Sequence, residues 1–231
     1  MKRSLIAAFA FTAIANCANA QSNKARFIVK GGLNLANIST TNTGRVDDAN
    51  YLTSFHAGFL GDIPIAGPLS FQPGLLVTGK GSKTNIYLDN NNTSANYYKL
   101  TTNPIYLEIP ANFVFHVGNG SGLFFGAGPY AAMGIAGKTT GERNILGVVS
   151  SYDKTIEFNN DNPFTAGQED ASVNKLRKYD FGLNALAGFE GAKYLVGVNY
   201  GYGLSKIGSS EANENDRNKH RVLSISLGLK L

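Results

Sequence analysis

Hydrophobic and polar side chains alternate with a period of two along most of the chain after residue 25. In the stretch 26–38, Val29 and Leu33 fall on one side of an extended chain. Lys30 and Asn34 fall on the other side. This alternation is typical of a β-strand whose two faces meet different surroundings, and a helix would not keep it. The pattern recurs in seven further segments, so we predict eight strands: 26–38, 51–63, 69–83, 103–117, 122–138, 177–190, 194–205 and 223–231.

The lengths of the strands and of their connections point to a membrane barrel. Most of the predicted strands exceed the ~5–6 residues usual in globular sheets and reach the ~9–11 residues that cross a bilayer when tilted. The connections are alternately long and short, so all the long ones fall on one side of an antiparallel sheet. Outer-membrane barrels have this arrangement, with short periplasmic turns and longer outer loops. The long loops are predicted at 39–50, 84–102, 139–176 and 208–219, and the tight turns at 64–68, 118–121 and 191–193.

Aromatic residues on the apolar face gather at two heights along these strands. Two such girdles mark the two interfaces of a membrane. The girdle near the tight turns contains Phe27, Phe71, Phe115, Phe125, Phe189 and Tyr194, and the girdle near the long loops contains Tyr51, Phe55, Tyr97, Tyr179 and Tyr202. We therefore predict an all-β fold, an eight-stranded antiparallel up-and-down transmembrane β-barrel with four long loops on one side.

The first twenty residues differ from the rest and predict a secretory signal peptide. A basic start is followed by an apolar run over 5–15 and by the cleavage pattern Ala18-Asn19-Ala20. The run is too short to span a bilayer, and no later stretch holds ~18 uninterrupted apolar residues. We expect residues 1–20 to be removed and residues 21–231 to form the barrel domain.

Cysteine usage leaves one alternative for this leader. Cys17 is the only cysteine, and a lipoprotein would carry its lipid there. Asn16 before it does not fit the small residue that lipoprotein processing normally needs, so simple cleavage is favoured. Cleavage before Gln21 removes Cys17, and the mature domain then holds no disulfide.

Composition and charge exclude several classes of protein. Hydrophobic residues make up 43% of the chain and charged residues 16%, which is too apolar for a disordered chain. Loss of the leader leaves 19 basic against 16 acidic residues, a net charge of +3. This excess is too small to indicate nucleic-acid binding. The expected partners are instead outer-membrane lipid and, during insertion, the barrel assembly machinery.

The polar face supplies the candidate site residues. An eight-stranded barrel is only wide enough for side chains to fill, and unpaired charges inside it are costly. We therefore expect its inward charges to form a mutually paired ladder. The candidates are Lys30, Lys80, Glu108, Lys178, Asp180 and Glu190. A soluble lipocalin-like barrel, with its apolar face inside and these charges outside, shows the same alternation and remains the alternative fold.

The chain contains three histidines. His56 and His116 fall on the inward face and are expected to form hydrogen bonds in the lumen. His220, beside Lys219 and Arg221, is expected to be solvated near the outer rim. No metal-ligand spacing, nucleophile elbow or phosphate-binding loop occurs in the sequence. We predict no catalytic residues, no metal and no cofactor, and a protein that is not an enzyme.

Several segments resemble a known family. The carrying motifs are Lys30-Gly-Gly-Leu-Asn-Leu-Ala-Asn-Ile38, Phe71-Gln-Pro-Gly-Leu75, Tyr106-Leu-Glu-Ile-Pro-Ala111, Gly126-Ala-Gly-Pro-Tyr130 and Tyr179-Asp-Phe-Gly-Leu183. Together they resemble the PorT-like outer-membrane β-barrel family of Bacteroidota, over nearly the whole mature chain. The resemblance implies a barrel without a shared catalytic motif, and the family's namesake is linked to secretion. The ending Ser224-Ile-Ser-Leu-Gly-Leu-Lys-Leu231 is similar to the last-strand signal that the assembly machinery reads.

The expected function follows from a filled lumen. We predict a surface or envelope module, structural or interacting with a partner protein through the four long loops, and a secretion accessory is one form of it. Two alternatives stay open. One is a small-solute channel, and the other is a lipid-binding or enzymatic barrel with converging titratable groups near its rim.

Overall fold

The computed structural model describes residues 25–39, 49–87, 96–118, 121–158, 175–207 and 218–231. The expected signal peptide lies outside the described residues. So do most of the long loops at 39–50 and 208–219. In the described part of the chain, no helix is long and apolar enough to cross a membrane.

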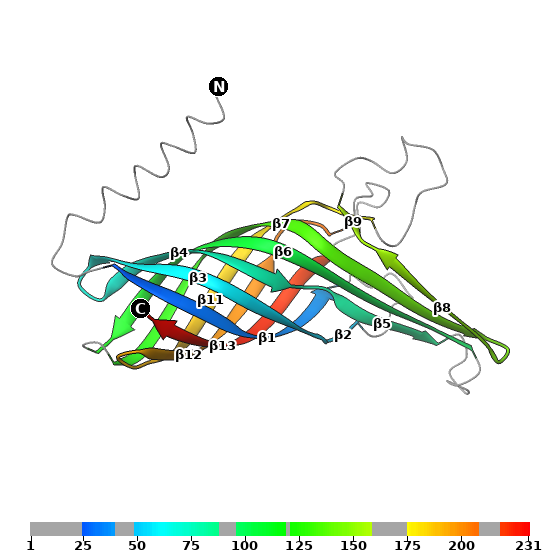
Figure 1. Cartoon of the computed structure of the whole chain (residues 1–231), viewed down its shortest axis with the longest axis horizontal. Helices are drawn as coiled ribbons and strands as arrows, with labels where there is room; N and C mark the ends of the chain where they lie inside the picture. The colour runs from blue at the N-terminus through cyan, green and yellow to red at the C-terminus, as the bar shows by residue number, and fades with distance from the viewer. Residues whose placement is uncertain (1–24, 40–48, 88–95, 119–120, 159–174, 208–217) are drawn as a thin grey trace, which may run out of the picture.

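Eight long strands form a closed ring (Figure 1). Each strand is antiparallel to both neighbours, and β1 (Arg26–Ser39) pairs with both β3 (Leu52–Ala66) and β13 (Lys219–Lys230), which joins the first strand to the last. The pairing of β6 with β7 links the two halves of the ring. The expected eight-stranded antiparallel barrel is therefore confirmed. Its strands are β1 (Arg26–Ser39), β3 (Leu52–Ala66), β4 (Leu69–Gly79), β6 (Asn96–Val117), β7 (Gly122–Ile145), β11 (Tyr179–Glu190), β12 (Tyr194–Gly203) and β13 (Lys219–Lys230).

The two ends of the barrel are different. The three short connections β3–β4, β6–β7 and β11–β12 lie at one end, which we call the turn end, together with the start of β1 and the end of β13. The long connections leave from the opposite loop end. At the turn end, Gly67 makes the β3–β4 connection with a φ of +51°, a conformation that glycine adopts without steric cost.

The described parts of two expected loops, 84–87 with 96–102 and 139–158 with 175–176, are mostly strand, which corrects the loop prediction for them. Strands β6 and β7 stay paired from Val117↔Leu123 at the turn end to Asn96↔Ile145, far beyond the ring. The missed segments mix polar and apolar side chains on both faces, as in Tyr97-Tyr98-Lys99 and Val148-Val149-Ser150, so no period of two marks them. The additional strands are β2 (Ala49–Asn50), β5 (Ser82–Tyr87), β8 (Val148–Thr155), β9 (Glu157–Phe158) and β10 (Lys175–Leu176).

The additional strands extend the barrel wall on one side. Strand β5 pairs with the first part of β6, and β8 pairs with the last part of β7. In the order β2–β5–β6–β7–β8 they form a sheet that continues past the rim of the ring, at the right in Figure 1. We call this sheet the projecting sheet.

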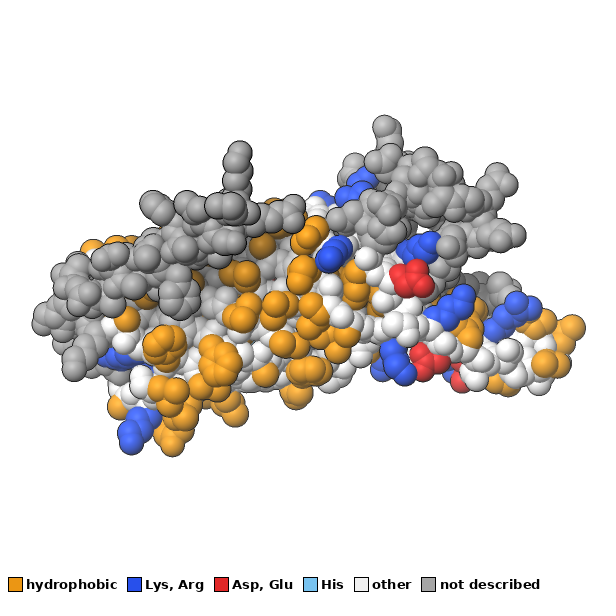
Figure 2. All heavy atoms as spheres, turned by 45° about the horizontal axis from the view of Figure 1, so that its top comes forward, with side chains coloured by type: hydrophobic (Ala, Val, Ile, Leu, Met, Phe, Trp, Pro, Cys, Tyr) orange, Lys and Arg blue, Asp and Glu red, His pale blue; other side chains and the backbone are white. Residues whose placement is uncertain are grey.

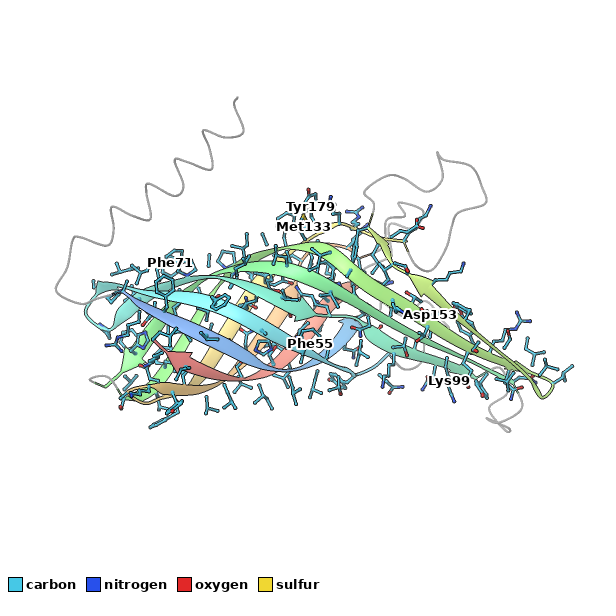
Figure 3. The ribbon with its side chains drawn as sticks, in the orientation of Figure 1. Phe55, Phe71, Lys99, Met133, Asp153 and Tyr179 are labelled. Atoms are coloured by element: carbon cyan, nitrogen blue, oxygen red, sulfur yellow. The ribbon has the colours of Figure 1, made fainter. Side chains whose placement is uncertain are left out.

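The barrel is apolar outside and polar inside. Phe27 is 67% exposed, whereas its inward neighbour Ile28 is 1% exposed and Asn34 is completely buried. Outward aromatic and aliphatic side chains cover the ring (Figures 2 and 3), with Phe55, Met133 and Tyr179 among them. A soluble barrel has the reverse distribution, because it buries its apolar face. The lipocalin-like alternative is therefore wrong.

Most of the predicted girdle aromatics lie on this outer surface. Phe71 is only half-buried, and Tyr97 departs from the prediction because it lies on the projecting sheet. There its hydroxyl donates a 2.6 Å hydrogen bond to Glu142. The exposed members are Phe27, Phe115, Phe125, Phe189 and Tyr194 toward the turn end, and Tyr51, Phe55, Tyr179 and Tyr202 toward the loop end.

Candidate functional site

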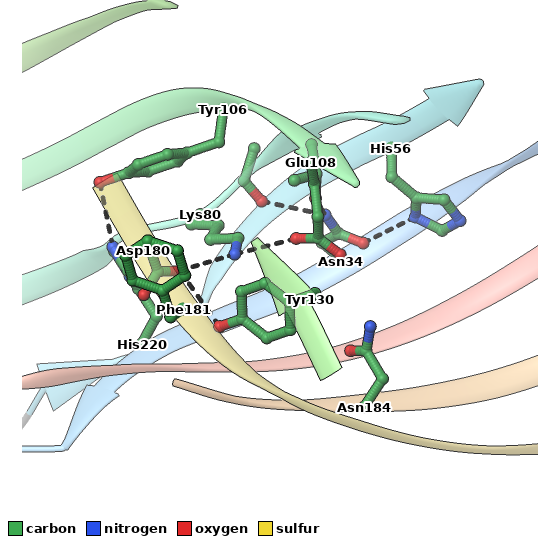
Figure 4. Close-up of polar contacts among 12 residues, drawn as sticks. Asn34, His56, Lys80, Tyr106, Glu108, Tyr130, Asp180, Phe181, Asn184 and His220 are labelled. Atoms are coloured by element: carbon green, nitrogen blue, oxygen red, sulfur yellow. Dashed lines mark hydrogen bonds and ion pairs between the residues drawn. The ribbon is translucent and has the colours of Figure 1, made fainter. Parts of the chain in front are cut away.

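The lumen near the loop end holds a buried ion network centred on Lys80. Lys80 follows β4, and its Nζ lies 2.8 Å from Oδ2 of Asp180 on β11 and 2.9 Å from Oε2 of Glu108 on β6 (Figure 4). The same nitrogen lies 4.1 Å from the centre of the Tyr130 ring. All three charged residues are less than 8% exposed, so their mutual attraction is poorly screened by water.

Two hydroxyl groups complete the hydrogen bonding of the Asp180 carboxylate. Ser205 donates to Oδ1 at 2.6 Å, and Tyr130 donates to Oδ2 at 3.1 Å. Removal of one partner from such a buried pair leaves an uncompensated charge and is strongly destabilising. The network therefore ties β4, β6, β7 and β11 together across the lumen.

His220 lies beside this network, and the expectation that it is solvated is wrong. Its exposure is 1%, and its ring packs edge-on against Tyr106, with centroids 5.5 Å apart. Its Nε2 lies 3.4 Å from the Tyr106 hydroxyl. Strand β13 begins at Lys219, four residues before the predicted start, so His220 is already in the ladder and on its inward face.

A layer of neutral polar groups lies below the ion network. The side-chain nitrogen of Asn34 donates to Thr78 Oγ1 at 3.0 Å and to the Gly79 carbonyl at 2.9 Å. Because that nitrogen faces acceptors, Oδ1 faces the donors, His56 Nδ1 at 2.7 Å and the Ser224 hydroxyl at 2.8 Å. His56 is thereby fixed by hydrogen bonds in the lumen.

An apolar layer crosses the lumen nearer the turn end. Its members are buried, come from six different strands and contact one another across the barrel. The sequence did not predict this layer, because each strand contributes only one or two apolar residues to an otherwise polar face. The layer consists of Ile28, Leu60, Leu76, Val114, Phe124 and Leu195, with Leu186 packed against it.

A second polar cluster closes the turn end. His116 Nδ1 lies 2.6 Å from Glu190 Oε1, and the opposite carboxylate oxygen of Glu190 pairs with Lys230 Nζ. His116 Nε2 lies 2.8 Å from Ser70 Oγ and 3.6 Å from Asp62 Oδ1. Asp62 and Lys230 were not among the candidates, although both fall on the polar face.

The candidate residues divide into groups in the structure. Lys80, Glu108 and Asp180 meet in one network, and Glu190 belongs to the cluster at the turn end. Lys30 faces the lumen, where it lines a cavity of about 20 Å³ with Gln72, Asn112 and Glu190. A cavity of this size holds about one water molecule.

Lys178 does not join the ladder. It lies at a bend before β11, where it is exposed, and its carbonyl accepts a 2.7 Å hydrogen bond from the amide of Gly134. The antiparallel ladder of β11 begins at Tyr179, so the alternation does not extend to Lys178.

Apolar side chains close the mouth of the barrel at the loop end. Ile156, Leu176 and Ile207 are each less than 8% exposed and form one cluster. Phe158 joins them and packs edge-on against Tyr106, which belongs to the polar lumen below. We call this cluster of Ile156, Phe158, Leu176 and Ile207 the mouth plug. The short parallel pairing of β9 with β10 holds it in place.

The projecting sheet is stitched by side-chain contacts of its own. The ring of Tyr152 on β8 lies over Gly141 of β7, and its hydroxyl forms a hydrogen bond with that of Tyr98. Partial burial and this hydrogen bond raise the pKa of Tyr152 to about 12. A Cβ at Gly141 would enter the ring, so the glycine makes room for it.

The outer strand of the projecting sheet is exposed along its length. Among the described residues no strand pairs with the far side of β8, which stands last in the sheet order. Seven of its eight residues are exposed, and the eighth is Tyr152. Val148 and Val149 are 72% and 58% exposed.

No group of three or more His, Cys, Asp or Glu side chains suited to a metal ion occurs in the described ranges. The buried acids of the lumen instead face lysines, hydroxyl groups, the His116 ring and the Gln72 amide. The arrangement can therefore hold the strands together and fill the lumen.

Comparison with known proteins gives a family and a set of distant structural relatives. The chain is similar to the crystal structure of Ail, the attachment invasion locus protein of Yersinia pestis, at 11% identity and a TM-score of 0.43 over 90% of this chain and 100% of the other. It is also similar to Neisserial surface protein A, at 13% identity and a TM-score of 0.36 over 90% and 99%. No curated protein matches it significantly.

The family assignment comes from the sequence profile of a barrel domain. The profile described as "Outer membrane protein beta-barrel domain" matches residues 19–209. These residues include seven of the eight ring strands, from β1 to β12. The chain belongs to the outer membrane protein beta-barrel domain family.

Proposed function

We propose that this protein is an integral outer-membrane anchor that presents the projecting sheet to a partner protein, which binds by adding a strand to β8. The observation that carries the proposal is the exposed edge of β8, the last strand of a sheet that extends past the rim of the barrel. Within the family, the motifs around Lys30 and Tyr106 favour a PorT-like branch.

The outer-membrane location is supported by the distribution of side chains. An apolar outer surface with two aromatic girdles fits a bilayer, and a closed barrel leaves no unpaired sheet edge within it. The predicted signal peptide would deliver the chain to the periplasm. The loop end, with the projecting sheet, would then face outward.

The layers of the lumen favour an anchor over a channel. A solute passing through the barrel would have to cross the mouth plug, the Lys80 network and the apolar layer around Leu60. All three are built from buried side chains that contact their neighbours. The parts that remain available for a partner lie outside the ring.

The chemistry of an edge strand explains the kind of partner. A strand at the edge of a sheet carries free backbone amide and carbonyl groups that an extended segment of another chain can pair with. Natural proteins usually protect such edges with proline, bulges or charged side chains. Strand β8 contains no proline. Its charged residues Asp153 and Lys154 lie in its second half, and the valines of its first half are exposed.

Photo-cross-linking in intact cells tests the proposal. The predicted mature chain has no cysteine, so a benzophenone label can be placed on Ser150→Cys or Ser151→Cys in β8. Lys99→Cys, exposed on β6 of the same sheet but away from the edge, is the matched control. The expected result is a discrete protein adduct from β8 and none from position 99. Equal labelling at both places, or no adduct from a correctly inserted barrel, would contradict the proposal.

A further inference from the structure

A groove lies on the outer, apolar surface of the barrel near the turn end. It has a volume of about 380 Å³ and is lined by the start of β1, the second half of β3 and the middle of β4. Its wall is almost entirely apolar, with one cationic residue at its end. The lining residues that matter are Arg26, Phe27, Phe59, Gly61, Pro73 and Leu75.

The groove exists because two outward positions, 61 and 73, hold the small residues glycine and proline. Gly61 faces outward between Phe59 and Ile63, and Phe27 stands directly opposite it on β1. Pro73, on β4, has no amide hydrogen, and the pairing of β3 with β4 is interrupted between Gly74 and Phe71. The large neighbours therefore enclose a hollow that a side chain at position 61 would fill.

Position 61 has room for a side chain. A Cβ placed on Gly61 would meet nothing closer than Pro73 at 3.9 Å, an ordinary van der Waals distance. Other glycines of the same strand pair are different, since a Cβ on Gly74 would lie 2.6 Å from the Phe59 carbonyl oxygen. The hollow at Gly61 is therefore empty space rather than a close approach of two backbones.

Charge defines the end of the groove. Arg26 is exposed and lies at the turn end, next to Phe27 of the girdle. Its register partner Asp62 is buried, and the Asp62 carboxylate accepts a hydrogen bond from Gln72 at 3.1 Å. A guanidinium at a membrane interface can pair with a phosphate group in two parallel hydrogen bonds.

We propose that this groove holds an acyl chain of an anionic phospholipid from the periplasmic leaflet, with the lipid phosphate bound by Arg26. The chain would lie over Gly61 between Phe27, Phe59 and Leu75, in continuity with the lipid-facing surface. The proposal rests on the outer-membrane location inferred above. It is independent of what binds β8.

The test uses a tryptophan reporter in a protein whose sequence has no tryptophan. Phe27→Trp places the reporter in the groove, and Phe189→Trp places it in the same girdle, on β11. Each variant is refolded into vesicles containing phosphatidylcholine and either brominated phosphatidylglycerol or brominated phosphatidylcholine. Quenching of the tryptophan then reports which lipid contacts it.

Selectivity at Phe27→Trp is the expected result. Brominated phosphatidylglycerol should quench this tryptophan about three- to fivefold more strongly than brominated phosphatidylcholine, which is the selectivity expected of one cation near an anionic headgroup. At Phe189→Trp the two lipids should quench equally. Adding Arg26→Gln should remove the preference. Adding Gly61→Leu should remove quenching in the groove, while Gly31→Leu, at an outward glycine of β1 with its nearest atom at 3.6 Å, should leave it unchanged.

Three outcomes would overturn the proposal. Equal lipid preference at both reporters would show ordinary boundary lipid only. Loss of quenching at Phe27→Trp in either lipid, together with a cross-linked dimer, would show that a second copy covers the groove. Unchanged quenching in Gly61→Leu would show that the lipid does not enter it. A barrel that fails to insert, detected as loss of heat-modifiable migration, would instead contradict the membrane location on which the proposal rests.

Discussion

Lys80 and Asp180 are 100 residues apart in the sequence, yet Lys80 Nζ lies 2.8 Å from Asp180 Oδ2 in a site nearly closed to water. This contact joins β4 to β11 across the barrel. Because the inward charges are paired in this way, they can be buried in the lumen without water around them. The stability of the barrel therefore depends on the pairing of these charges.

Replacing Lys80 by methionine should lower the free energy of unfolding by about 3–5 kcal/mol, because Glu108 and Asp180 would remain buried without a cation. The matched control is Lys138→Met, which breaks the Lys138–Asp153 pair. Both side chains of that pair are more than half exposed, so its loss should lower the free energy of unfolding by less than about 1 kcal/mol. Urea unfolding of vesicle-inserted protein, followed by tyrosine fluorescence, measures both. A similar small loss in both variants would argue against a paired lumen.

Glycine at position 32 should be essential for closure of the barrel. A Cβ there would lie 1.9 Å from the Ile225 carbonyl oxygen and 2.8 Å from the His56 ring. Gly32→Ala should destabilise the barrel by at least about 1–3 kcal/mol through overpacking. Gly31→Ala, the neighbouring outward glycine, should be tolerated. Heat-modifiable migration on gels separates the two, and equal behaviour of both variants would show that β1 is not held in this register.

The turn between β7 and β8 offers a stabilising change. Leu146 has a φ of +51° and Gly147 a φ of +84°, so both central residues of the turn are left-handed. A left-handed conformation costs a leucine roughly 1–2 kcal/mol, and asparagine with glycine is the preferred pair in such turns. Leu146→Asn should therefore slow hydrogen exchange of the β7–β8 hairpin several-fold, and Leu146→Val should accelerate it. The reverse order would show a different turn.

Alkaline pH should loosen the projecting sheet before the ring. The pKa of Tyr152 is raised to about 12 in the folded sheet, against about 10 in an unfolded chain. Its contribution to stability is therefore complete below pH ~10 and is lost as the pH rises through ~12. The Tyr152 ring carbon resonance, assigned with Tyr152→Phe, should titrate near pH 12. A midpoint near pH 10 would mean that Tyr152 does not pack on Gly141.

The filled lumen predicts electrical silence. In planar bilayers the inserted protein should give no stable conductance steps, because the apolar layer and the mouth plug close the barrel at two heights. A porin inserted under the same conditions is the positive control. Regular, reproducible steps from the protein would contradict a filled lumen and favour the small-solute channel.

The sequence predicted the ring strands well because buried and exposed residues alternate along each of them. Each ring strand has one face toward apolar surroundings, so residues such as Val29 and Asn34 alternate visibly. The projecting sheet was missed because polar and apolar side chains do not alternate between its faces. Strand pairing there rests on backbone hydrogen bonds and contacts such as Tyr152 on Gly141. Such contacts leave no period in the sequence.

The sequence predicted which kinds of residue fill the lumen, but not which of them pair. Charges on the polar face identified Lys80, Glu108 and Asp180 as members of a lumen network. Which charges meet depends on the stagger of the strands around the ring, which alternation does not determine. Lys178 is exposed because the β11 ladder begins only at the next residue, and His220 is buried because β13 begins earlier than its apolar run.

The most direct test of the central claim is photolabelling of the inserted, unmodified protein with a phospholipid that carries a carbene precursor in its acyl chain. Residue-level mass spectrometry of β13 would then show which face meets lipid. We predict label on Leu223, Ile225 and Leu227, which are 40–66% exposed, and none on Ser224 or Ser226 between them. Label on the serines, or none anywhere on the strand, would contradict a barrel that is apolar outside and filled with polar side chains inside.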